Sequence, residues 1–577
     1  MEIKICQNCK NEFKIEGEDF SFYEKIKVPP PTFCPDCRMI RRFMFRNERV
    51  WYRRDCMATG KKILSMYSPD LPLVVYDQEH WRSDNWDPLS YGRKYDFNID
   101  FFTQFQDLFQ SVPHPNLIQK NMVNTEYSNY ALNAKNCYYI ASVDGAEDSA
   151  YLFGSVVNSY QSMDLYQSGD SDQCYELIDC QRTNRVFFSQ NCESCTSSYF
   201  LYDCRNCSFC FGCVGLRSKN YCIFNIQYSK EEYFEKLKEM GVDSFTKLKE
   251  YKNQFEDLKK KVPRKYAVIN NSQDVSGDNI SNSQNCHNVF SIWDDIQDSR
   301  YSFRLFKKVK DGYDGYVVWN GSELFYEDVS CSGQRIFFSA YIWGGFDIEY
   351  SYNCFDCNNI FGCIGLKNKS YCIFNTQYSK EEYFKLKKQI KEQMNKMPYI
   401  DNLGRIYSYG EFFPASLSPF AYNETVAQEY FPTNQEDAFK YGYPWRTQEK
   451  KEYGLTMRAD ELPDTIGQTP ELITKEVIGC EHNGRCNNNC STAFKIAPQE
   501  FLLYKTLNLP LPRLCPQCRH SERLGLINPM KLYHRQCMCK KGSHNHTGNC
   551  LNEFETPYAP ESSEIVYCED CYQSEVQ

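Results

Sequence analysis

The sequence predicts a mainly β protein with a central duplicated β-solenoid of the parallel β-helix type, closed by capping helices and flanked by a cysteine-rich module at each end. Three observations support this fold class. The middle of the chain repeats itself at an offset of 150 residues, short aromatic segments recur within each repeat, and the two ends match at an offset of 481 residues. Internal repeats of short, regularly spaced strands are typical of solenoids. A propeller or a sandwich remains an alternative.

The N-terminal module contains two CxxC pairs, Cys6 with Cys9 and Cys34 with Cys37. Zinc takes four soft ligands in a tetrahedron, and two such pairs separated by a short hairpin supply them. A segment this short and polar could hardly fold without a metal ion. We therefore expect one zinc site here.

The C-terminal module is a copy of the N-terminal one. Adding 481 to Cys9, Cys34 and Cys37 gives three further cysteines. The fourth ligand is expected to be a cysteine four residues before the first of them, where Cys6 has its counterpart. The predicted ligands of this second site are Cys486, Cys490, Cys515 and Cys518.

The end of the chain predicts a third zinc site. After a ten-residue insertion the match between the ends resumes at an offset of 491, and the C-terminal copy supplies Cys550, Cys568 and Cys571. Cys537 is the expected fourth ligand. The alternatives for that position are Cys539, His544 and His546, since neutral imidazole also binds zinc well.

The matching part of the N-terminal module is expected to hold no metal. It keeps Cys56 as the counterpart of Cys537, but Thr59, Asp77 and His80 stand where the other copy has cysteines. A catalytic metal normally needs three good ligands already in place. We read this part as a degenerate submodule.

These residues resemble the zinc-ribbon family through the pattern CxxCxxxF followed by PxxCPxCR at both ends. The whole chain is similar to a group of large bacterial multi-zinc-ribbon proteins. The resemblance implies zinc binding and carries no established activity with it.

A treble-clef-like arrangement is expected around the second cysteine pair of each end module, because Pro35 and Pro516 lie inside these pairs and suit the first turn of a helix. Several arginines follow the second cysteine pair at each end, and few acidic residues lie among them to balance their charge. They are candidate contacts to RNA or DNA phosphates. The alternative is a helix face that pairs with the chain's own carboxylates. The nucleic-acid candidates are Arg38, Arg41, Arg42, Arg46, Arg519 and Arg523.

A row of four cysteines at intervals of three residues lies in the first central repeat: Cys204, Cys207, Cys210 and Cys213. It resembles the cysteine run of an iron–sulfur protein. In the second repeat, however, Ile360 replaces Cys210, and isoleucine cannot bind a cluster, whereas a buried thiol behaves as a small apolar group. A stack of core thiols is favoured over zinc, and zinc over an iron–sulfur cluster.

Helices are expected at three places in the centre. Phe101, Phe105 and Leu108 give one apolar helical face before the repeats. Each repeat closes with a helix that opens on a capping box, Ser229 with Glu232 and Ser379 with Glu382.

We expect six consecutive parts. In order they are an N-terminal module with one zinc site and a degenerate second submodule (1–90), a connector with an amphipathic helix (91–123), solenoid repeat A with its closing helix (124–262), solenoid repeat B with its closing helix (263–398), an extended connector (399–479) and a C-terminal double zinc module (480–577).

The sequence does not favour an enzyme, and we assign no residue to catalysis or to the binding of an organic cofactor. Parallel β-helices do support carbohydrate-active enzymes, so clustered aspartates are considered as acid and base groups. Aspartate at a turn is the commoner explanation. The aspartates concerned are Asp164, Asp170, Asp172, Asp294, Asp295 and Asp298.

The favoured function is a zinc-binding scaffold or adaptor that engages a macromolecule, either a protein or structured RNA. The net charge of -9 argues against a protein that coats nucleic acid as a whole. The 31 cysteines occur without a secretory signal or an apolar span, which favours the reducing cytoplasm and no membrane partner. Three zinc ions are expected and an iron–sulfur cluster is not.

Overall fold

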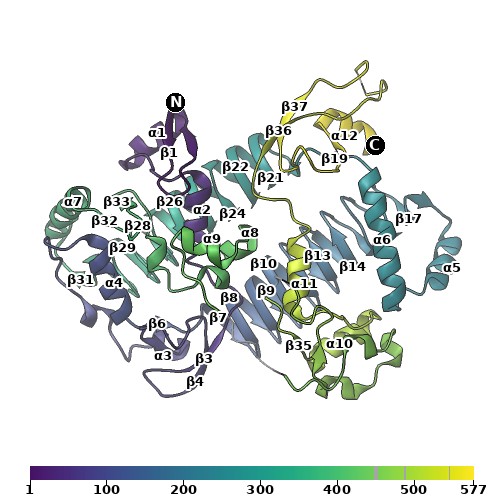
Figure 1. Cartoon of the computed structure of the whole chain (residues 1–577), viewed down its shortest axis with the longest axis horizontal. Coiled ribbons are helices and arrows are strands. Elements are labelled where there is room, and N and C mark those ends of the chain that lie inside the picture. Colours follow the sequence, from purple (N-terminus) through teal and green to yellow (C-terminus); the bar gives the residue numbers. More distant parts are fainter. Residues whose placement is uncertain (448–452, 487–488, 545, 577) are drawn as a thin grey trace. The chain divides into compact units, whose positions relative to one another are not determined.

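The computed structural model describes residues 1–447, 453–486, 489–544 and 546–576. The chain forms two compact units (Figure 1). Unit 1 consists of Met1–Ile118 with Ala267–Thr447, and unit 2 of Gln119–Tyr266 with Gln448–Gln577. The N-terminal module thus belongs with the second repeat, and the C-terminal module with the first. The six parts expected in sequence order are interleaved into two.

Each unit is mainly β and is built on one long sheet of stacked, mostly parallel strands, which we call its ladder. The strands of the unit 1 ladder are β20 (Ile269–Asn270), β21 (Gln273–Ser281), β22 (Ser283–Trp293), β23 (Ile296–Arg300), β24 (Phe303–Phe306), β25 (Val309–Trp319), β26 (Glu323–Val329), β27 (Ser332–Phe337), β28 (Trp343–Glu349), β29 (Phe355–Phe361), β30 (Ser370–Ile373) and β31 (Thr376–Gln377). The strands of the unit 2 ladder are β7 (Gln119–Val123), β8 (Glu126–Lys135), β9 (Tyr138–Glu147), β10 (Ala150–Tyr160), β11 (Met163–Tyr166), β12 (Gly169–Asp172), β13 (Tyr175–Ile178), β14 (Gln181–Gln190), β15 (Thr196–Tyr199), β16 (Ser208–Phe211), β17 (Asn220–Ile223) and β18 (Ile226–Gln227).

The remaining elements surround the ladders. In unit 1 they are β1 (Glu2–Ile5), β2 (Glu12–Ile15), α1 (Gly17–Ile26), α2 (Pro35–Phe43), β3 (Tyr52–Asp55), β4 (Lys62–Ser65), β5 (Val75–Tyr76), α3 (Gln78–Arg82), η1 (Pro88–Tyr91), α4 (Phe101–Ser111), β6 (His114–Pro115), α7 (Lys380–Lys396), β32 (Tyr399–Ile400), β33 (Ile406–Tyr407), η2 (Ala415–Leu417), η3 (Tyr422–Glu424), α8 (Val426–Tyr430) and α9 (Gln435–Lys440). In unit 2 they are α5 (Lys230–Met240), α6 (Phe245–Lys261), β19 (Arg264–Lys265), η4 (Ala459–Glu461), η5 (Ile466–Gln468), η6 (Glu471–Lys475), β34 (Ile478–Gly479), β35 (Ala493–Phe494), α10 (Pro498–Leu507), α11 (Pro516–Leu524), β36 (Tyr533–Gln536), β37 (Glu553–Thr556), β38 (Val566–Tyr567) and α12 (Glu569–Val576).

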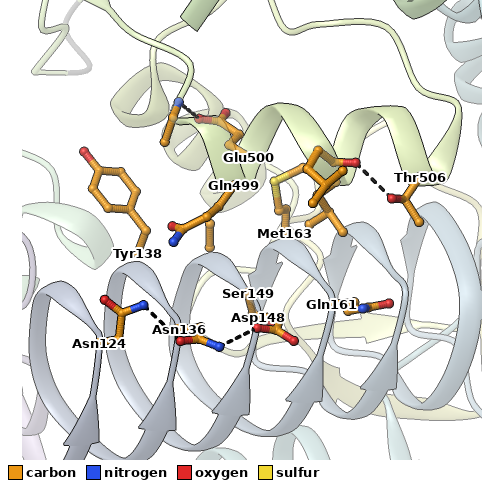
Figure 2. Close-up of a pocket in the computed structure, with 14 residues that line it drawn as sticks. Asn124, Asn136, Tyr138, Asp148, Ser149, Gln161, Met163, Gln499, Glu500 and Thr506 are labelled. Atoms are coloured by element: carbon orange, nitrogen blue, oxygen red, sulfur yellow. Dashed lines mark hydrogen bonds between the residues drawn. The ribbon is translucent and has the colours of Figure 1, made fainter.

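Neighbouring ladder strands pair in parallel at an offset close to twelve residues. In unit 2, Thr196 pairs with Ser208 and Ser208 pairs with Asn220. Figure 2 shows this stacking in another part of the unit 2 ladder, around Asn124, Asn136 and Asp148. The recurrence of short segments in the sequence reflects this stacking, since each rung adds one strand to the sheet.

A left-handed residue at nearly every third position bends the chain within each rung. Asn121, Asn124, Tyr127, Tyr130 and Asn133, for example, have φ between 45° and 57°. Asparagine, aspartate and glycine adopt this conformation readily, whereas an aromatic residue does so at a cost of about 1–2 kcal/mol. Other contacts within the ladder must offset this conformational cost.

Stacking between aromatic rings offsets part of the cost of the left-handed conformation. Phe188 and Phe200, both left-handed, stack with their centroids 4.8 Å apart, and Phe209 stacks on Tyr221 at 5.5 Å. Each pair spans one twelve-residue offset. Many of the aromatic residues in the sequence lie in such columns or in the contacts around them.

The three-residue period also explains the row of cysteines. Because the chain bends at every third residue, residues three apart present their side chains to the same interior. Cys204, Cys207, Cys210 and Cys213 are buried in the core of the unit 2 ladder together with alanine, valine, leucine and isoleucine. Cys210 pairs with Cys222 in the next strand. Each thiol of the row lies against a backbone carbonyl two residues earlier, as Cys207 Sγ does 3.3 Å from the oxygen of Arg205.

The helices at the ladder ends have the expected starts. α5 opens with a capping box of Ser229 and Glu232, and α7 with one of Ser379 and Glu382. In unit 1, α4 buries Phe101, Phe105 and Leu108. No helix in the described part of the chain is both long enough and apolar enough to cross a membrane.

Candidate metal centres

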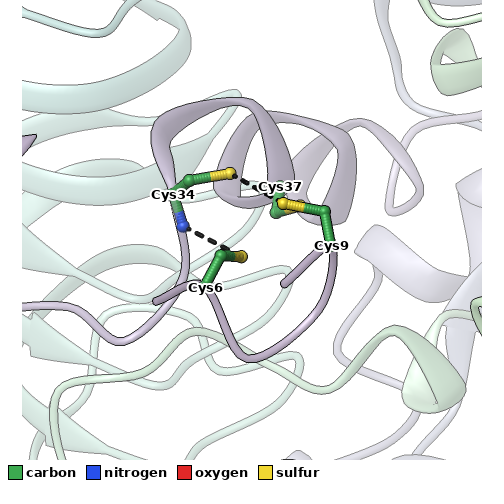
Figure 3. A group of neighbouring side chains, drawn as sticks. All are labelled: Cys6, Cys9, Cys34 and Cys37. Carbon is green, nitrogen blue, oxygen red and sulfur yellow. Dashed lines mark hydrogen bonds between the residues drawn. The ribbon is translucent and has the colours of Figure 1, made fainter. Parts of the chain in front are cut away.

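The first candidate centre lies in unit 1 and consists of Cys6, Cys9, Cys34 and Cys37 (Figure 3). Cys6 and Cys9 occupy the turn between β1 and β2. Cys34 is the N-cap of α2, and Cys37 lies in the first turn of that helix. The four sulfur atoms all lie within 4.8 Å of one another.

The spacing of these sulfurs fits a tetrahedral metal ion. Cys9 Sγ and Cys34 Sγ are 3.7 Å apart. A tetrahedron with metal–sulfur bonds of about 2.3 Å has edges of about 3.8 Å, whereas a disulfide would bring the two atoms to about 2.05 Å. The N-terminus of α2 favours thiolates at Cys34 and Cys37 because its dipole is positive there. The group could therefore hold a metal ion.

The second candidate centre, in unit 2, consists of Cys480, Cys490, Cys515 and Cys518. Cys480 takes the place in which Cys486 was expected, and Cys486 instead belongs to a smaller group with His482 and Cys518. The Cys515 amide donates to Cys480 Sγ at 3.3 Å, as the Cys34 amide donates to Cys6 Sγ at 3.3 Å. This shared contact identifies Cys480 as the counterpart of Cys6.

The convergence of Cys480 with the other three cysteines has a local cause. Cys480 directly follows β34, which pairs with β35, just as Cys6 directly follows β1, which pairs with β2. The apolar residues Val477 and Ile478 before Cys480 were the available signal, since Arg485 precedes Cys486. Cys486 lies close by, with its sulfur 3.7 Å from that of Cys518.

We expect Cys480→Ser to cost the full-length protein one bound metal ion and Cys486→Ser to cost it none, because only Cys480 belongs to the four-cysteine group. Metal content per chain, measured on both purified variants and on the parent, checks this. Loss of an ion from the Cys486 variant alone would contradict the assignment.

The third candidate centre, also in unit 2, consists of Cys537, Cys550, Cys568 and Cys571. Cys537 follows β36, and Cys568 follows β38 at the start of α12. The Cys568 amide donates to Cys537 Sγ at 3.2 Å, and the sulfurs of Cys550 and Cys568 are 3.9 Å apart. The remaining candidates, Cys539, His544 and His546, form a separate group with Cys571.

The corresponding part of unit 1 is held together by hydrogen bonds. The Asp77 amide donates to Cys56 Sγ at 3.2 Å, which matches the contact of Cys568 with Cys537. The Cys56 thiol and the Thr59 hydroxyl both donate to Asp77 Oδ2, at 3.1 and 3.3 Å. The same carboxylate caps α3 through the amide of His80. One carboxylate thus occupies the centre of this submodule.

The arginines of α2 are buried against the unit 1 ladder. Arg38 and Arg42 contact the two oxygens of Asp314, at 2.9 and 3.0 Å. Arg41 contacts Glu327 at 2.8 Å and Glu411 at 3.0 Å. Burial raises the pKa of Glu327 to about 7 although Arg41 opposes the shift. All of these charged side chains are at most 3 % exposed except Glu411, which is 6 % exposed.

The same contact recurs in unit 2, where α11 packs on the ladder. Arg519 lies 3.3 Å and Arg523 2.8 Å from Asp164, which is fully buried. Asp164 and Asp314 are separated by the 150-residue offset of the repeats, and Arg38 and Arg519 by the 481-residue offset of the ends. The Asp164 and Asp314 contacts are therefore two copies of one docking contact.

These contacts decide between the two uses considered for the arginines. Arg46 is also buried, with its Nε 2.6 Å from Glu48. The arginines thus pair with the chain's own carboxylates, and their guanidinium groups are withdrawn from solvent and from any phosphate. The prediction of a nucleic-acid contact at Arg38, Arg41, Arg42, Arg46, Arg519 and Arg523 is corrected on this ground.

The aspartates considered as acid and base groups have structural partners or turn positions. Asp170 accepts from Asn158 at 2.9 Å, Asp172 from Asn184 at 2.7 Å, and Asp298 from Asn285 at 2.7 Å. Asp164 is held by its arginines. Asp294 and Asp295 are left-handed turn residues in unit 1.

A groove of about 390 Å³ lies in unit 2 between α10 and the ladder (Figure 2). One wall carries a column of hydrogen-bonded side chains, in which Asn124 donates to Asn136 and Asn136 donates to Asp148. The opposite wall is formed by α10, which contributes Leu502 and Leu503 together with the polar side chains of Gln499 and Thr506. The groove therefore offers both apolar and polar contacts.

Comparison with protein-family models gives no match, and comparison with curated proteins gives none either. A solved structure described as a candidate acetyltransferase from Desulfovibrio desulfuricans G20 is 10% identical, with 52% of this chain and 76% of that chain covered and a TM-score of 0.10. At this TM-score the likeness supports neither a fold nor an activity. The metal-binding geometry of the cysteine groups is the strongest functional evidence.

Proposed function

We propose that the chain is a non-enzymatic zinc-binding scaffold or adaptor that engages a macromolecular partner. In this proposal each ladder is a β-solenoid with about twelve residues per coil, supported by the parallel pairing and by the left-handed bends. Each solenoid carries a zinc module of the zinc-ribbon or treble-clef kind. The many free thiols favour a reducing compartment, in keeping with the cytoplasm.

Zinc is the metal that these groups suit best. Four thiolates in a tetrahedron are typical of closed structural zinc sites, which leave no open position for a substrate. The proposal assigns one zinc ion to each four-cysteine group and no iron–sulfur cluster. If the purified protein contained iron and absorbed broadly near 400 nm, an iron–sulfur cluster would replace zinc in this assignment, because thiolate-bound clusters are strongly coloured.

The observation that carries a scaffold function is the pair of buried docking contacts. Asp314 and Asp164 each hold two arginines of a zinc-module helix in a nearly water-free contact. A charge buried in this way favours one orientation of the helix on its ladder, because any other orientation leaves that charge unpaired. The zinc modules therefore act as fixed parts of their units.

A protein is the favoured partner ahead of structured RNA. The arginines that could have bound phosphate are committed to internal carboxylates, and the chain carries a net charge of -9. The groove beside α10 has the concave shape and the mixture of apolar and polar side chains that are typical of binding sites. We propose it as part of the partner-binding surface of unit 2.

The first test uses the zinc-loaded full-length protein on immobilised structured RNA at 50 and 200 mM salt. We expect no retention that weakens with salt, whereas an RNA-binding protein with several phosphate contacts would lose affinity by orders of magnitude over this range. Salt-dependent retention would favour RNA as the partner and count against the protein adaptor.

The second test compares two matched variants in capture of a protein partner after nuclease treatment. Leu502→Asp alters the groove at a side chain that is 64% exposed, and Leu472→Asp alters a side chain that is 62% exposed and lies outside the groove lining. We expect only Leu502→Asp to abolish capture. Equal capture by the two variants would exclude the groove, and a capture that nuclease abolishes would again favour RNA.

A further inference from the structure

A second group of metal ligands lies beside the third candidate centre and shares one cysteine with it. Cys539, His544, His546 and Cys571 have their donor atoms within 4.8 Å of one another. Cys571 is also a member of the group with Cys537, Cys550 and Cys568. We propose that the C-terminal module binds two metal ions bridged by the Cys571 thiolate.

The distances in the second group fit a tetrahedral ion with mixed ligands. Cys539 Sγ lies 3.1 Å from His544 Nδ1, and Cys571 Sγ lies 3.4 Å from His546 Nε2. For zinc bonds of about 2.3 Å to sulfur and about 2.0–2.1 Å to nitrogen, a sulfur–nitrogen edge is about 3.6 Å. Two cysteines and two histidines form a common closed zinc site.

The second ring nitrogen of each histidine supports this role independently. His544 Nε2 lies 3.3 Å from Glu575 Oε1, and His546 Nδ1 lies 3.1 Å from the carbonyl oxygen of Gly548. A proton on each of these nitrogens leaves the lone pair of the other directed at the cysteines. Metal-bound histidines typically hold their outer N–H in this way, on a carboxylate or a backbone carbonyl.

The thiolate of Cys539 is supported as well. The backbone amide of Lys541 donates to Cys539 Sγ at 3.4 Å. The Thr492 amide donates to Cys490 Sγ at 3.3 Å in the second centre, with the same separation of two residues. Cys539 therefore has the backbone contact of a ligand cysteine.

The charge of the cluster also favours two ions. A single divalent ion on four thiolates carries a net charge of −2. A second divalent ion, bound by the Cys539 thiolate and two neutral histidines while sharing Cys571, brings the total to −1. The second ion thus reduces the buried negative charge without any further residue.

The comparison of the two ends explains where the extra ligands come from. The C-terminal copy contains a ten-residue insertion between Cys537 and Cys550, as the offsets of 481 and 491 show. Cys539, His544 and His546 all lie in that stretch. Its N-terminal counterpart runs from Cys56 to Thr59 and has no such residues. The insertion thus adds three ligands next to a cysteine already present.

This inference rests on the proposed metal loading of the cysteine groups, and the test separates the two. The full-length protein is loaded with ¹¹³Cd²⁺, and metal content and cadmium NMR are recorded. We expect four ions per chain and one pair of resonances with mutual coupling through the shared thiolate. Three ions, or four without coupling, would overturn the bridged pair but keep the proposed function. A chain without bound metal would overturn both.

Two variants locate the second ion. His544→Gln combined with His546→Gln is expected to leave three ions and no coupled pair. The control, His534→Gln, changes an exposed histidine that pairs with Glu553 and Glu555 on the hairpin of the same module, and it is expected to keep all four. Four ions with coupling retained in the double variant would overturn the inference.

Discussion

Replacing Asp314 by asparagine is expected to lower the free energy of unfolding of unit 1 by about 3–5 kcal/mol. The asparagine side chain would fit the same space but remove the counter-charge of the buried Arg38 and leave Arg42 with only Glu327, 3.9 Å away. Removing one partner from a buried ion pair is costly for that reason, even where the intact pair adds little to stability.

The sequence offers a convenient probe for this measurement. All 7 tryptophans belong to unit 1, so tryptophan fluorescence during denaturant unfolding reports on that unit. The matched control is Asp311→Asn, which removes the more exposed contact of Asp311 with Lys25 from the same strand. We expect that control to change stability by less than about 1 kcal/mol. Similar shifts in the two variants would contradict the role given to Asp314.

Replacing Cys34 by serine is expected to have a still larger effect. The change removes one of four ligands at the start of α2, so the metal no longer anchors the helix that carries Arg38 and Arg42. Structural zinc sites contribute about 10–16 kcal/mol of apparent binding free energy in small zinc domains. We therefore expect the variant to lose one metal ion and to unfold at lower denaturant than Asp314→Asn.

Metal content per chain and tryptophan fluorescence together check this prediction. The control is Cys56→Ser, because Cys56 is buried in the same module but lies in the hydrogen-bonded submodule. That variant should keep the metal content of the parent. An unchanged metal content after Cys34→Ser would rule out the first centre.

The local features of the ends could be predicted from the sequence because they depend on short spacings. Cys6, Cys9, Cys34 and Cys37 converge as their CxxC pattern indicates. The capping boxes at Ser229 and Ser379 are present for the same reason, since a cap needs only residues within one turn. The duplication of the chain was likewise visible in the offsets alone.

Features that depend on distant contacts could not be predicted. Arg38 and Asp314 are 276 residues apart, so the sequence gives no sign that they meet. Cys480 was missed because the loop to Cys490 is longer than in the first copy, and Cys486 offered a closer match in spacing. The left-handed residues of the ladders include tyrosine and phenylalanine, which rarely adopt that conformation alone. Their backbone is set by the stacked rungs around them.

The interleaving of the two units imposes an order on synthesis at the ribosome. α2 emerges early, but Asp314 follows Arg38 only after 276 further residues, which at about 5–20 residues per second takes about 15–55 s. During that time the α2 arginines have no ladder carboxylate. In unit 2 the order is reversed, and Asp164 waits for arginines near the end of the chain. A nascent chain that stops before Arg519 therefore leaves the Asp164 carboxylate without the arginines that pair with it in the complete unit, which is costly for a buried charge.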